Sequence, residues 1–336
     1  MAHKPWLTAK EQIGHLENLG VRFEQMSKDE AVSYLTNNSN YFRIKSFRSG
    51  FKTVRSGARE GQYENLDFAM LVDLSVIDML LRYEMLPMAL DIEHFAKVQL
   101  LREIESHNED GYEIVQGFIS SSDSFDPRTN RKINYVKSEI DRTRKSEGER
   151  APSPDGSKYE YPAWSFIEMV SFGSICRFYK YCSDRFDEKS MNQFYYQLLP
   201  VKTLRNACAH NHCIINSLSA KTARYKTDYA ISDAISKISS IGSQQRRSRM
   251  SNEWIQSIAS TLYLHKTICS AGVVVHRSTS LATFKSRMLR HVDYYQANTD
   301  VSSTFLFLGK VIDAWYPTEV LNDTKTEQAA DTEPPH

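Results

Sequence analysis

The sequence lacks any long apolar run, and this absence excludes a membrane-spanning helix. No window approaches the roughly 18 consecutive apolar residues that such a helix needs, and the mean hydropathy is −0.49. The first residues, Met1 to Trp6, lack the apolar centre of a secretory signal peptide. Cysteine is also scarce, and an odd count of 5 without a secretion signal favours reduced thiols over a disulfide framework. We therefore expect a cytoplasmic protein that does not associate with membranes.

Charge of one sign is not in excess, and glycine and proline are few. The 42 Lys and Arg residues face 41 Asp and Glu, a net charge of +1. This balance excludes a uniformly basic nucleic-acid coat protein and confines any polyanion site to a local patch. The 13 Gly and 10 Pro are too few for the turns of a sandwich or barrel, which favours helices. Hydrophobic residues, 41% of 336, suffice for the core of one large domain or two ordinary ones.

Several enzyme motifs are missing as well. The sequence contains no G-x-x-x-x-G-K-[ST] loop, no G-x-G-x-x-G, no H-E-x-x-H, no G-x-S-x-G and no paired C-x-x-C. P-loop nucleotide hydrolysis, Rossmann redox chemistry, zincin proteolysis and hydrolase-type esterolysis therefore have no sequence support. No compact cluster of Asp and Glu indicates a metal-dependent nuclease. We expect neither a cofactor nor a bound metal.

Apolar residues spaced by 3 and 4 positions predict helices along most of the chain. Thr8 with Glu11, and Ser27 with Glu30, form capping boxes that predict two short N-terminal helices. A long core helix is expected over residues 66–107.

Later in the chain, a helical block is expected from Pro162 to about Cys182, and another helix after Pro200. Residues 304–315 fit either a helix or a strand. The expected fold is all-α. It begins with an N-terminal helical and aromatic-basic region at 1–60, followed by a helical bundle at 61–220 that carries a basic insertion at about 120–160. A C-terminal helical region at 221–320 and a disordered tail at 321–336 complete the chain.

Three basic segments are candidates for contact with RNA. Residues 40–51 alternate aromatic and cationic side chains, a pattern that can stack bases and bind phosphates; the alternative is that the aromatics pack inward while the cations stay solvated. Residues 128–150 hold 8 cations against 4 acids, which suits RNA but is also typical of a solvated charged helix. The third segment is a basic spot around residue 246. The RNA-binding candidates are Arg43, Lys45, Arg48, Arg131, Lys132, Arg142, Arg144, Lys145, Arg246 and Arg247.

One short segment combines the side chains that RNA cleavage without a metal requires. Residues 204–216 read LRNACAHNHCIIN and bring Arg205, Asn206 and His210 close together in sequence. Such cleavage needs a base for the 2′-OH proton, an acid for the departing 5′-oxygen and a cation for the charge on the phosphorane. Histidine titrates near neutral pH and can serve as base or acid, and the arginine fork matches phosphate oxygens.

The spacing of Arg205 and His210 restricts how they can act together. Five residues of an ideal helix leave the two side chains about 140° apart. Either the helix loosens near His210, or two such helices face each other, which predicts a composite site in a two-fold symmetric dimer. One alternative is a surface cation with a helix-end histidine. Another is a zinc site of Cys208, His210, His212 and Cys213, although ligands this close in sequence cannot easily surround one ion.

The context of this segment resembles the Abi family of abortive-infection proteins, of the AbiD and AbiF type, within the HEPN superfamily. The resemblance covers about residues 4–220 and rests on four stretches in the order found in that family. They are KPWLT with Gln12 and Ile13 at 4–13, YFR to GF at 41–51, PAW with EMVSFG at 162–173, and LRNACAH at 204–210.

The resemblance implies an HEPN-like helical bundle, often dimeric, whose R-x4-6-H motif is a metal-independent ribonuclease site leaving 2′,3′-cyclic phosphate ends. Arg205 and His210 would be the catalytic pair, with Asn206 the polar residue after the motif arginine. Glu168 falls in the family's E-x-x-S-F-G stretch, where it would orient Arg205 or form a buried ion pair. The family is linked to phage defence, and some members lie beside a small non-coding RNA, which implies an RNA that silences or directs the nuclease.

Three functions follow from these observations. The first is a HEPN endoribonuclease that acts as the toxic effector in phage defence. The second is a catalytically silent, helical RNA-binding module of a defence ribonucleoprotein, since some HEPN proteins are inactive. For both of these functions we expect RNA rather than DNA as the partner. Only the nuclease should harm a host that expresses it alone. The third, an obligate protein partner in a toxin–antitoxin pair, has less support because no partner groove is marked in the sequence.

Overall fold

A computed structural model of the chain describes residues 6–126, 128–147, 159–296 and 298–318. The regular structure of these residues is helical, apart from one antiparallel hairpin of β1 (Asp123–Phe125) and β2 (Lys132–Asn134) and two isolated bridges. The prediction of an all-α fold is confirmed. The helices are α1 (Ala9–Asn18), α2 (Lys28–Asn37), α3 (Tyr41–Ser46), α4 (Phe68–Ser106), α5 (Gly111–Ser121), α6 (Tyr135–Glu147), α7 (Ala163–Met169), α8 (Phe172–Phe186), α9 (Lys189–Ala209), α10 (Tyr229–Ser236), α11 (Ser243–Met250), α12 (Glu253–Ile268), α13 (Ala271–Leu289), the 3-10 helix η1 (Val292–Tyr295) and α14 (Thr299–Trp315).

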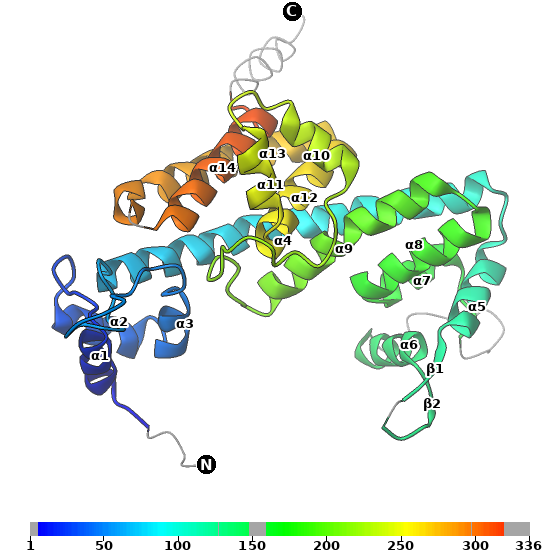
Figure 1. Cartoon of the computed structure of the whole chain (residues 1–336). Helices are drawn as coiled ribbons and strands as arrows, with labels where there is room; N and C mark the ends of the chain where they lie inside the picture. Colours follow the sequence, from blue (N-terminus) through cyan, green and yellow to red (C-terminus); the bar gives the residue numbers. More distant parts are fainter. Residues whose placement is uncertain (1–5, 127, 148–158, 297, 319–336) are drawn as a thin grey trace, which may run out of the picture.

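Helix α4 is the long axis of the molecule. It continues through Pro87 for 39 residues, which is about 58 Å at a rise of about 1.5 Å per residue. Helices α1–α3 lie near its beginning and α5–α8 near its end, while α10–α14 gather above it in the view of Figure 1. Helices α9, α12 and α13 pack directly against α4.

Two hydrophobic clusters form the interior. The larger contains the first half of α4 together with residues of α1–α3 and α10–α14, and the smaller contains the second half of α4 with residues of α5–α8. Helix α9 contributes to both, with Leu198 and Val201 in the smaller cluster and Leu204 and Ala207 in the larger. The end of α9 therefore lies where the two clusters meet.

The N-terminal helices begin as their capping boxes predict. Thr8 and Glu11 cap α1 reciprocally, each side chain accepting from the other's peptide N–H, and Ser27 and Glu30 do the same for α2. Both helices bury one apolar face in the larger cluster.

Two predicted helix boundaries are wrong. Helix α9 begins at Lys189, and Pro200 lies buried inside it, because packing of Leu198 and Val201 on either side keeps the helix continuous across the missing N–H. The block expected from Pro162 to about Cys182 is two helices. The chain is extended at Val170, and the Ser171 hydroxyl caps a new helix, α8, by accepting from the Ser174 N–H at 3.4 Å. Residues 304–315 are helical, within α14.

The basic insertion consists of the β1–β2 hairpin and α6, with residues 148–158 outside the described part. Glu139 fastens α6 to the bundle: its carboxylate accepts from the Ser171 N–H at 3.0 Å, the Ser171 hydroxyl at 2.9 Å and the Ser174 hydroxyl at 2.7 Å. The Thr143 hydroxyl adds a bond to the Met169 carbonyl at 2.9 Å. Helix α6 is thus attached at the corner between α7 and α8.

Among the described residues, no helix is both long enough and apolar enough to cross a bilayer. The tail predicted at 321–336 lies outside the described residues.

Candidate active site

The motif residues gather where α9 ends. Helix α9 stops at Ala209, and His210 caps it with φ −90° while its N–H donates to the Asn206 carbonyl at 3.0 Å. Arg205 is half-buried, whereas Asn206 and His210 are exposed. The Arg205 Nη1 donates to the Asn206 side-chain oxygen at 3.3 Å. The spacing allowed either a helix that loosens near His210 or two facing helices in a dimer. In the single chain, α9 ends at His210, and among the described residues no hydrogen bond joins Arg205 to His210. The dimer stays a prediction.

The acidic partner of Arg205 is Glu93 on α4. The Arg205 Nε lies 3.7 Å from the Glu93 Oε2, and their side chains are 30% and 13% exposed. Glu168, expected to orient Arg205, instead pairs with Lys97 at 2.9 Å. Burial raises the pKa of Glu93, the positive charges of Arg205 and Lys97 oppose this shift, and the negative charge of Glu168 adds to it. The four side chains form a charged group on α4, α7 and α9, in which Glu93 directly contacts the motif arginine.

A buried carboxylate fixes the segment that follows α9. Asp78 of α4 is 0% exposed, and its Oδ1 accepts from the peptide N–H groups of Ile214 at 2.7 Å and Ile215 at 3.1 Å. Its Oδ2 lies 3.1 Å from the Arg82 Nε and 3.7 Å from the Arg43 Nη1. Burial raises the pKa of Asp78, and the two N–H groups and two guanidiniums oppose that shift. This network holds the chain just beyond His210 against α4.

The turn after His210 is fixed by the same two arginines. Asn211 has a left-handed backbone with φ +58°, a conformation that Asn adopts more readily than most residues. Its side-chain oxygen accepts from Arg82, and its carbonyl accepts from Arg43. His212 follows and is exposed, with its ring centroid 6.1 Å from that of His210. The turn therefore presents two imidazoles to solvent.

The zinc alternative finds no support in the positions of the cysteines. Cys208 is buried, and burial raises the pKa of its thiol to about 12. The Cys213 sulfur accepts from the Ser46 hydroxyl at 3.6 Å and lies 3.7 Å from the Arg43 Nη1. Within the described ranges, no three His, Cys, Asp or Glu side chains come together as metal ligands.

Comparison with known proteins places the chain in a family. A family model described as Abi-like protein matches residues 34–216, more than half of the chain. The chain belongs to the Abi-like protein family. Neither curated proteins nor solved structures match it. The matched region contains Arg43, Glu93, Glu168, Arg205 and His210, and it ends before α10.

The N-terminal cations of this Abi-like protein contact its own chain. Arg43 is only 19% exposed, and its guanidinium contacts Asp78 and Asn211. Lys45 lies over the ring of Phe42 at 5.1 Å. Arg48 donates to the Lys45 carbonyl at 3.2 Å. Arg43 therefore positions the turn after α9, whereas its proposed contact with RNA stays a prediction.

The cations of the insertion differ in what they contact. Lys132 pairs with Asp123 across the hairpin at 2.7 Å, and Arg131 is exposed. Arg142 and Lys145 are exposed on α6, and Arg144 is half-buried. The insertion presents positive charge on one attached helix and one hairpin, and contact with RNA stays a prediction here too.

Arg246 and Arg247 of α11 lie far along the chain from the motif but face a cavity with other cations. Lys221, Arg224 and Lys226 line the same cavity, and sequence reasoning singled out none of these three.

Sequence reasoning also missed Asp78, Arg82 and Glu93. The available signal was the presence of charged residues within the long apolar stripe of residues 66–107, where each buried charge requires a partner. Asp78 and Arg82 pair with each other within one turn of α4, but the Ile214 N–H that Asp78 accepts from and the Arg205 that Glu93 contacts lie more than a hundred residues away in sequence.

Proposed function

We propose that this Abi-like protein is a metal-independent endoribonuclease of the HEPN type and the effector of an abortive-infection response to phage. The observation that carries the proposal is the last turn and cap of α9, which present exposed Asn206 and His210 and a half-buried Arg205 held by Glu93 within six residues of one another. The family membership supports the role in phage defence.

In the proposed reaction, an imidazole accepts the proton of a ribose 2′-OH as the 2′-oxygen attacks the adjacent phosphorus. The bond from phosphorus to the 5′-oxygen breaks, and an imidazolium gives its proton to that oxygen. Arg205, directed by Glu93 and hydrogen-bonded to Asn206, stabilises the charge on the phosphorane oxygens. The products are a 2′,3′-cyclic phosphate and a 5′-hydroxyl.

A second copy of the chain would complete the proposed site. The reaction uses one base and one acid, and two copies of His210 related by a two-fold axis can supply both. Met79, Tyr83, Leu90 and Val98 of α4 are exposed apolar side chains, and their spacing places them on one face of the helix. Glu93 lies about 60° around α4 from Leu90, so this apolar face borders the side on which Arg205 is held.

A catalytically silent RNA-binding module of a defence ribonucleoprotein is the second candidate. It is favoured by one observation: within a single chain Arg205 contacts Glu93 and makes no hydrogen bond to His210 in the described residues. In either case a small non-coding RNA bound to the basic surfaces would control the protein.

Expression in a bacterial host separates the two candidates. A nuclease arrests growth when expressed alone, and Arg205→Ala or His210→Ala restores growth at equal protein level, whereas a binding module is tolerated in every form. Arg185→Ala and His276→Ala are matched controls, because Arg185 is an ion-paired arginine on α8 and His276 an exposed histidine on α13. Growth arrest that persists in both motif variants would contradict the nuclease assignment.

A further inference from the structure

A cationic cavity lies apart from the end of α9, between residues 221–227, α10 and α11. Its volume is about 550 Å³, and its charged lining consists of Lys221, Arg224, Lys226, Arg246 and Arg247, with no Asp or Glu among the described residues that line it. The whole chain carries a net charge of only +1, so this lining is a strong local concentration of positive charge. Such a concavity attracts a polyanion.

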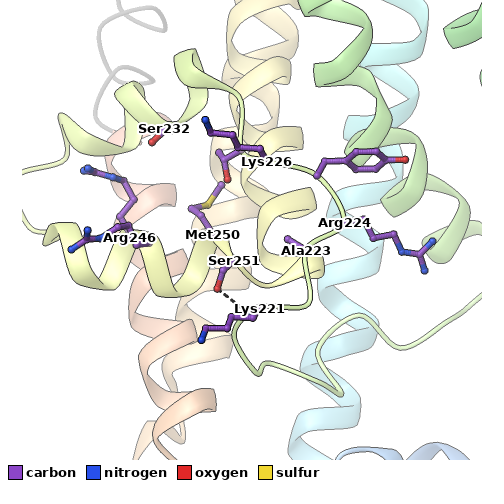
Figure 2. A pocket seen from close by; sticks show the side chains of 11 residues that line it. Lys221, Ala223, Arg224, Lys226, Ser232, Arg246, Met250 and Ser251 are labelled. Atoms are coloured by element: carbon purple, nitrogen blue, oxygen red, sulfur yellow. Dashed lines mark hydrogen bonds between the residues drawn. The ribbon is translucent and has the colours of Figure 1, made fainter.

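Most of these cations have no acidic partner among the residues that the structure describes. Arg224 pairs with Glu253, its Nε lying 3.0 Å from the Oε1. Figure 2 shows the charged ends of Lys221, Lys226 and Arg246 around Met250, whereas Arg224 extends to the other side. For the three around Met250, no ion pair occurs within the described part of the chain. Their positive charge is available to a ligand.

A second cavity adjoins the first and has a different character. Its volume is about 340 Å³, which is within the usual range of small-molecule pockets of about 300–1,000 Å³. Its lining combines the apolar side chains of Pro200 and Ile231 with the ring of Tyr196 and a few polar groups. The two cavities share Tyr225, Lys226 and Thr227 in their linings. A ligand with an anionic end and a flat apolar end fits across this boundary.

The segment between the cavities is held in place along its length. The Gln256 side chain, buried on α12, donates to the Tyr225 carbonyl at 3.0 Å and to the Thr227 hydroxyl at 2.9 Å. Asp228 accepts from Gln197 of α9 at 2.8 Å. At the other end, the Lys221 N–H donates to the Ser251 hydroxyl at 3.0 Å. The lining is therefore preformed, which lowers the entropy lost when a ligand binds.

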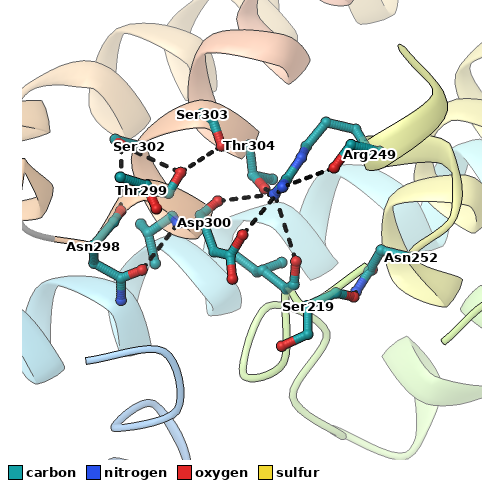
Figure 3. Close-up of polar contacts among 12 residues, drawn as sticks. Ser219, Arg249, Asn252, Asn298, Thr299, Asp300, Ser302, Ser303 and Thr304 are labelled. Carbon is teal, nitrogen blue, oxygen red and sulfur yellow. Dashed lines mark hydrogen bonds and ion pairs between the residues drawn. The ribbon is translucent and has the colours of Figure 1, made fainter. Parts of the chain in front are cut away.

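Helix α11 is also fixed in orientation, by a buried arginine. Arg249 is 8% exposed and donates to the Thr304 hydroxyl at 3.0 Å, and its Nη2 lies 3.1 Å from the Asp300 Oδ1 (Figure 3). These contacts fasten α11 to α14 on one side. Arg246 and Arg247, on other faces of the same helix, are left to line the cationic cavity.

We propose that the two cavities form a nucleotide-binding site, in which the cationic cavity holds the phosphate and the adjoining cavity holds the base. Arginine forks and lysine ammonium groups bind phosphate oxygens, and the half-exposed ring of Tyr225 offers a stacking surface at the boundary. The nucleotide is either free or part of an RNA strand. This site does not depend on the proposed nuclease activity.

The nucleotide site and the motif arginine occupy different faces of α9. Tyr196 and Pro200, which line the second cavity, lie about 180° and about 140° around α9 from Arg205. Binding at the two sites can therefore be measured independently with variants of each.

The phosphate half is tested with the full chain carrying His210→Ala, so that RNA is left intact. Binding of each of the four nucleoside 5′-monophosphates, and of a short single-stranded oligoribonucleotide, is measured by calorimetry and fluorescence anisotropy. Arg246→Gln with Arg247→Gln should weaken binding about tenfold or more, and should reduce the salt dependence of oligonucleotide binding by about 1.4 in log–log slope, at about 0.7 per contact. Arg55→Gln with Arg102→Gln removes the same charge from exposed residues that line neither cavity, and should change little.

The base half is tested in the same assay. Tyr225→Ala should weaken binding about tenfold, as loss of one stacked base predicts, and Tyr225→Phe should restore it. Tyr229→Ala is the control, because Tyr229 is exposed but lines neither of the two cavities. Inorganic phosphate and free nucleosides should bind more weakly than the monophosphates.

The outcomes separate the ligand source and the two proposals. Tight binding of a monophosphate identifies a free nucleotide, and binding of the oligonucleotide alone identifies an RNA strand. The proposal is overturned if the pocket variants bind as the controls do, or if inorganic phosphate competes as well as nucleotides. If the wild type cleaves no RNA but nucleotide binding still depends on the cavity residues, the nuclease proposal is rejected and the nucleotide-binding site is supported.

Discussion

Removing the buried carboxylate of Asp78 should destabilise the protein and release the turn that carries His210. Asp78→Ala leaves the N–H groups of Ile214 and Ile215 without an acceptor and removes the counter-charge of Arg82, whose side chain is 5% exposed. Breaking a buried ion pair by deleting one partner costs about 3–5 kcal/mol. We expect a loss of that size in the free energy of unfolding.

The substitution Asp78→Asn should cost less, about 2 kcal/mol. The amide oxygen can still accept from the two peptide N–H groups, but these hydrogen bonds lose their charged acceptor and the ion pair with Arg82 is lost; a hydrogen bond to a charged group is worth about 1.5–3 kcal/mol. Burial of the charge raises the pKa of Asp78 and shows that the carboxylate is itself costly to bury, which reduces the net loss. If the Ala variant does not fold, the Asn variant still permits the measurement.

The assay is urea-induced unfolding followed by circular dichroism, combined with hydrogen exchange of residues 210–216. The account predicts the order wild type, Asn variant, Ala variant in stability, with faster exchange in the turn of both variants. An Ala variant whose free energy of unfolding is within about 1 kcal/mol of the wild-type value would refute the reasoning. A loss that small is typical of a solvent-exposed ion pair and would mean that no buried network holds the turn.

Three further predictions follow from individual contacts. Arg43→Ala should lower the free energy of unfolding by about 1–3 kcal/mol, because this side chain contacts Asn211 and Asp78; a urea midpoint equal to that of wild type would contradict this. Glu93→Gln should lower the kcat of RNA cleavage about tenfold with little change in KM, because Glu93 positions Arg205, whereas the exposed Glu168→Gln should change neither. Burial lowers the pKa of His265. As the pH falls, this histidine is therefore protonated in the unfolded chain at a higher pH than in the folded chain, and the free energy of unfolding should decrease below the ordinary histidine pKa of 6.5. The urea midpoint, measured from pH 8 to 5, should decrease in wild type and in a His276→Gln control, and should decrease less in His265→Gln. An equal dependence of the midpoint on pH in all three proteins would contradict the role of His265.

Local sequence signals predicted the elements that local interactions determine. The capping boxes at Thr8 and Ser27 fix where α1 and α2 begin, because each cap is formed within four residues. The long apolar spacing of 66–107 predicted α4 to within two residues at each end. Pro200 misled because proline usually ends a helix, and here tertiary packing on both sides overrides that local preference.

The candidate site was predictable only in its motif. Arg205, Asn206 and His210 lie within six residues of one another, at the last turn and cap of α9. Their supports are long-range: Glu93 reaches Arg205 from α4, and Asp78 reaches Ile214 across 136 residues of sequence separation. No periodicity within one segment encodes such pairs. The basic cavity was predicted only in part, at Arg246 and Arg247, because its other cations, Lys221, Arg224 and Lys226, come from a separate loop that only the fold brings beside them.

The most direct test of the account is the chemistry of the RNA ends that the purified protein produces in the presence of EDTA. Wild type and the Arg185→Ala and His276→Ala controls should cleave RNA to 2′,3′-cyclic phosphate and 5′-hydroxyl ends. Arg205→Ala and His210→Ala, with unchanged circular dichroism, should lose about 10²- to 10⁴-fold in rate, the usual contribution of an acid–base group. Cleavage that EDTA abolishes, or that both motif variants retain, would contradict the central claim.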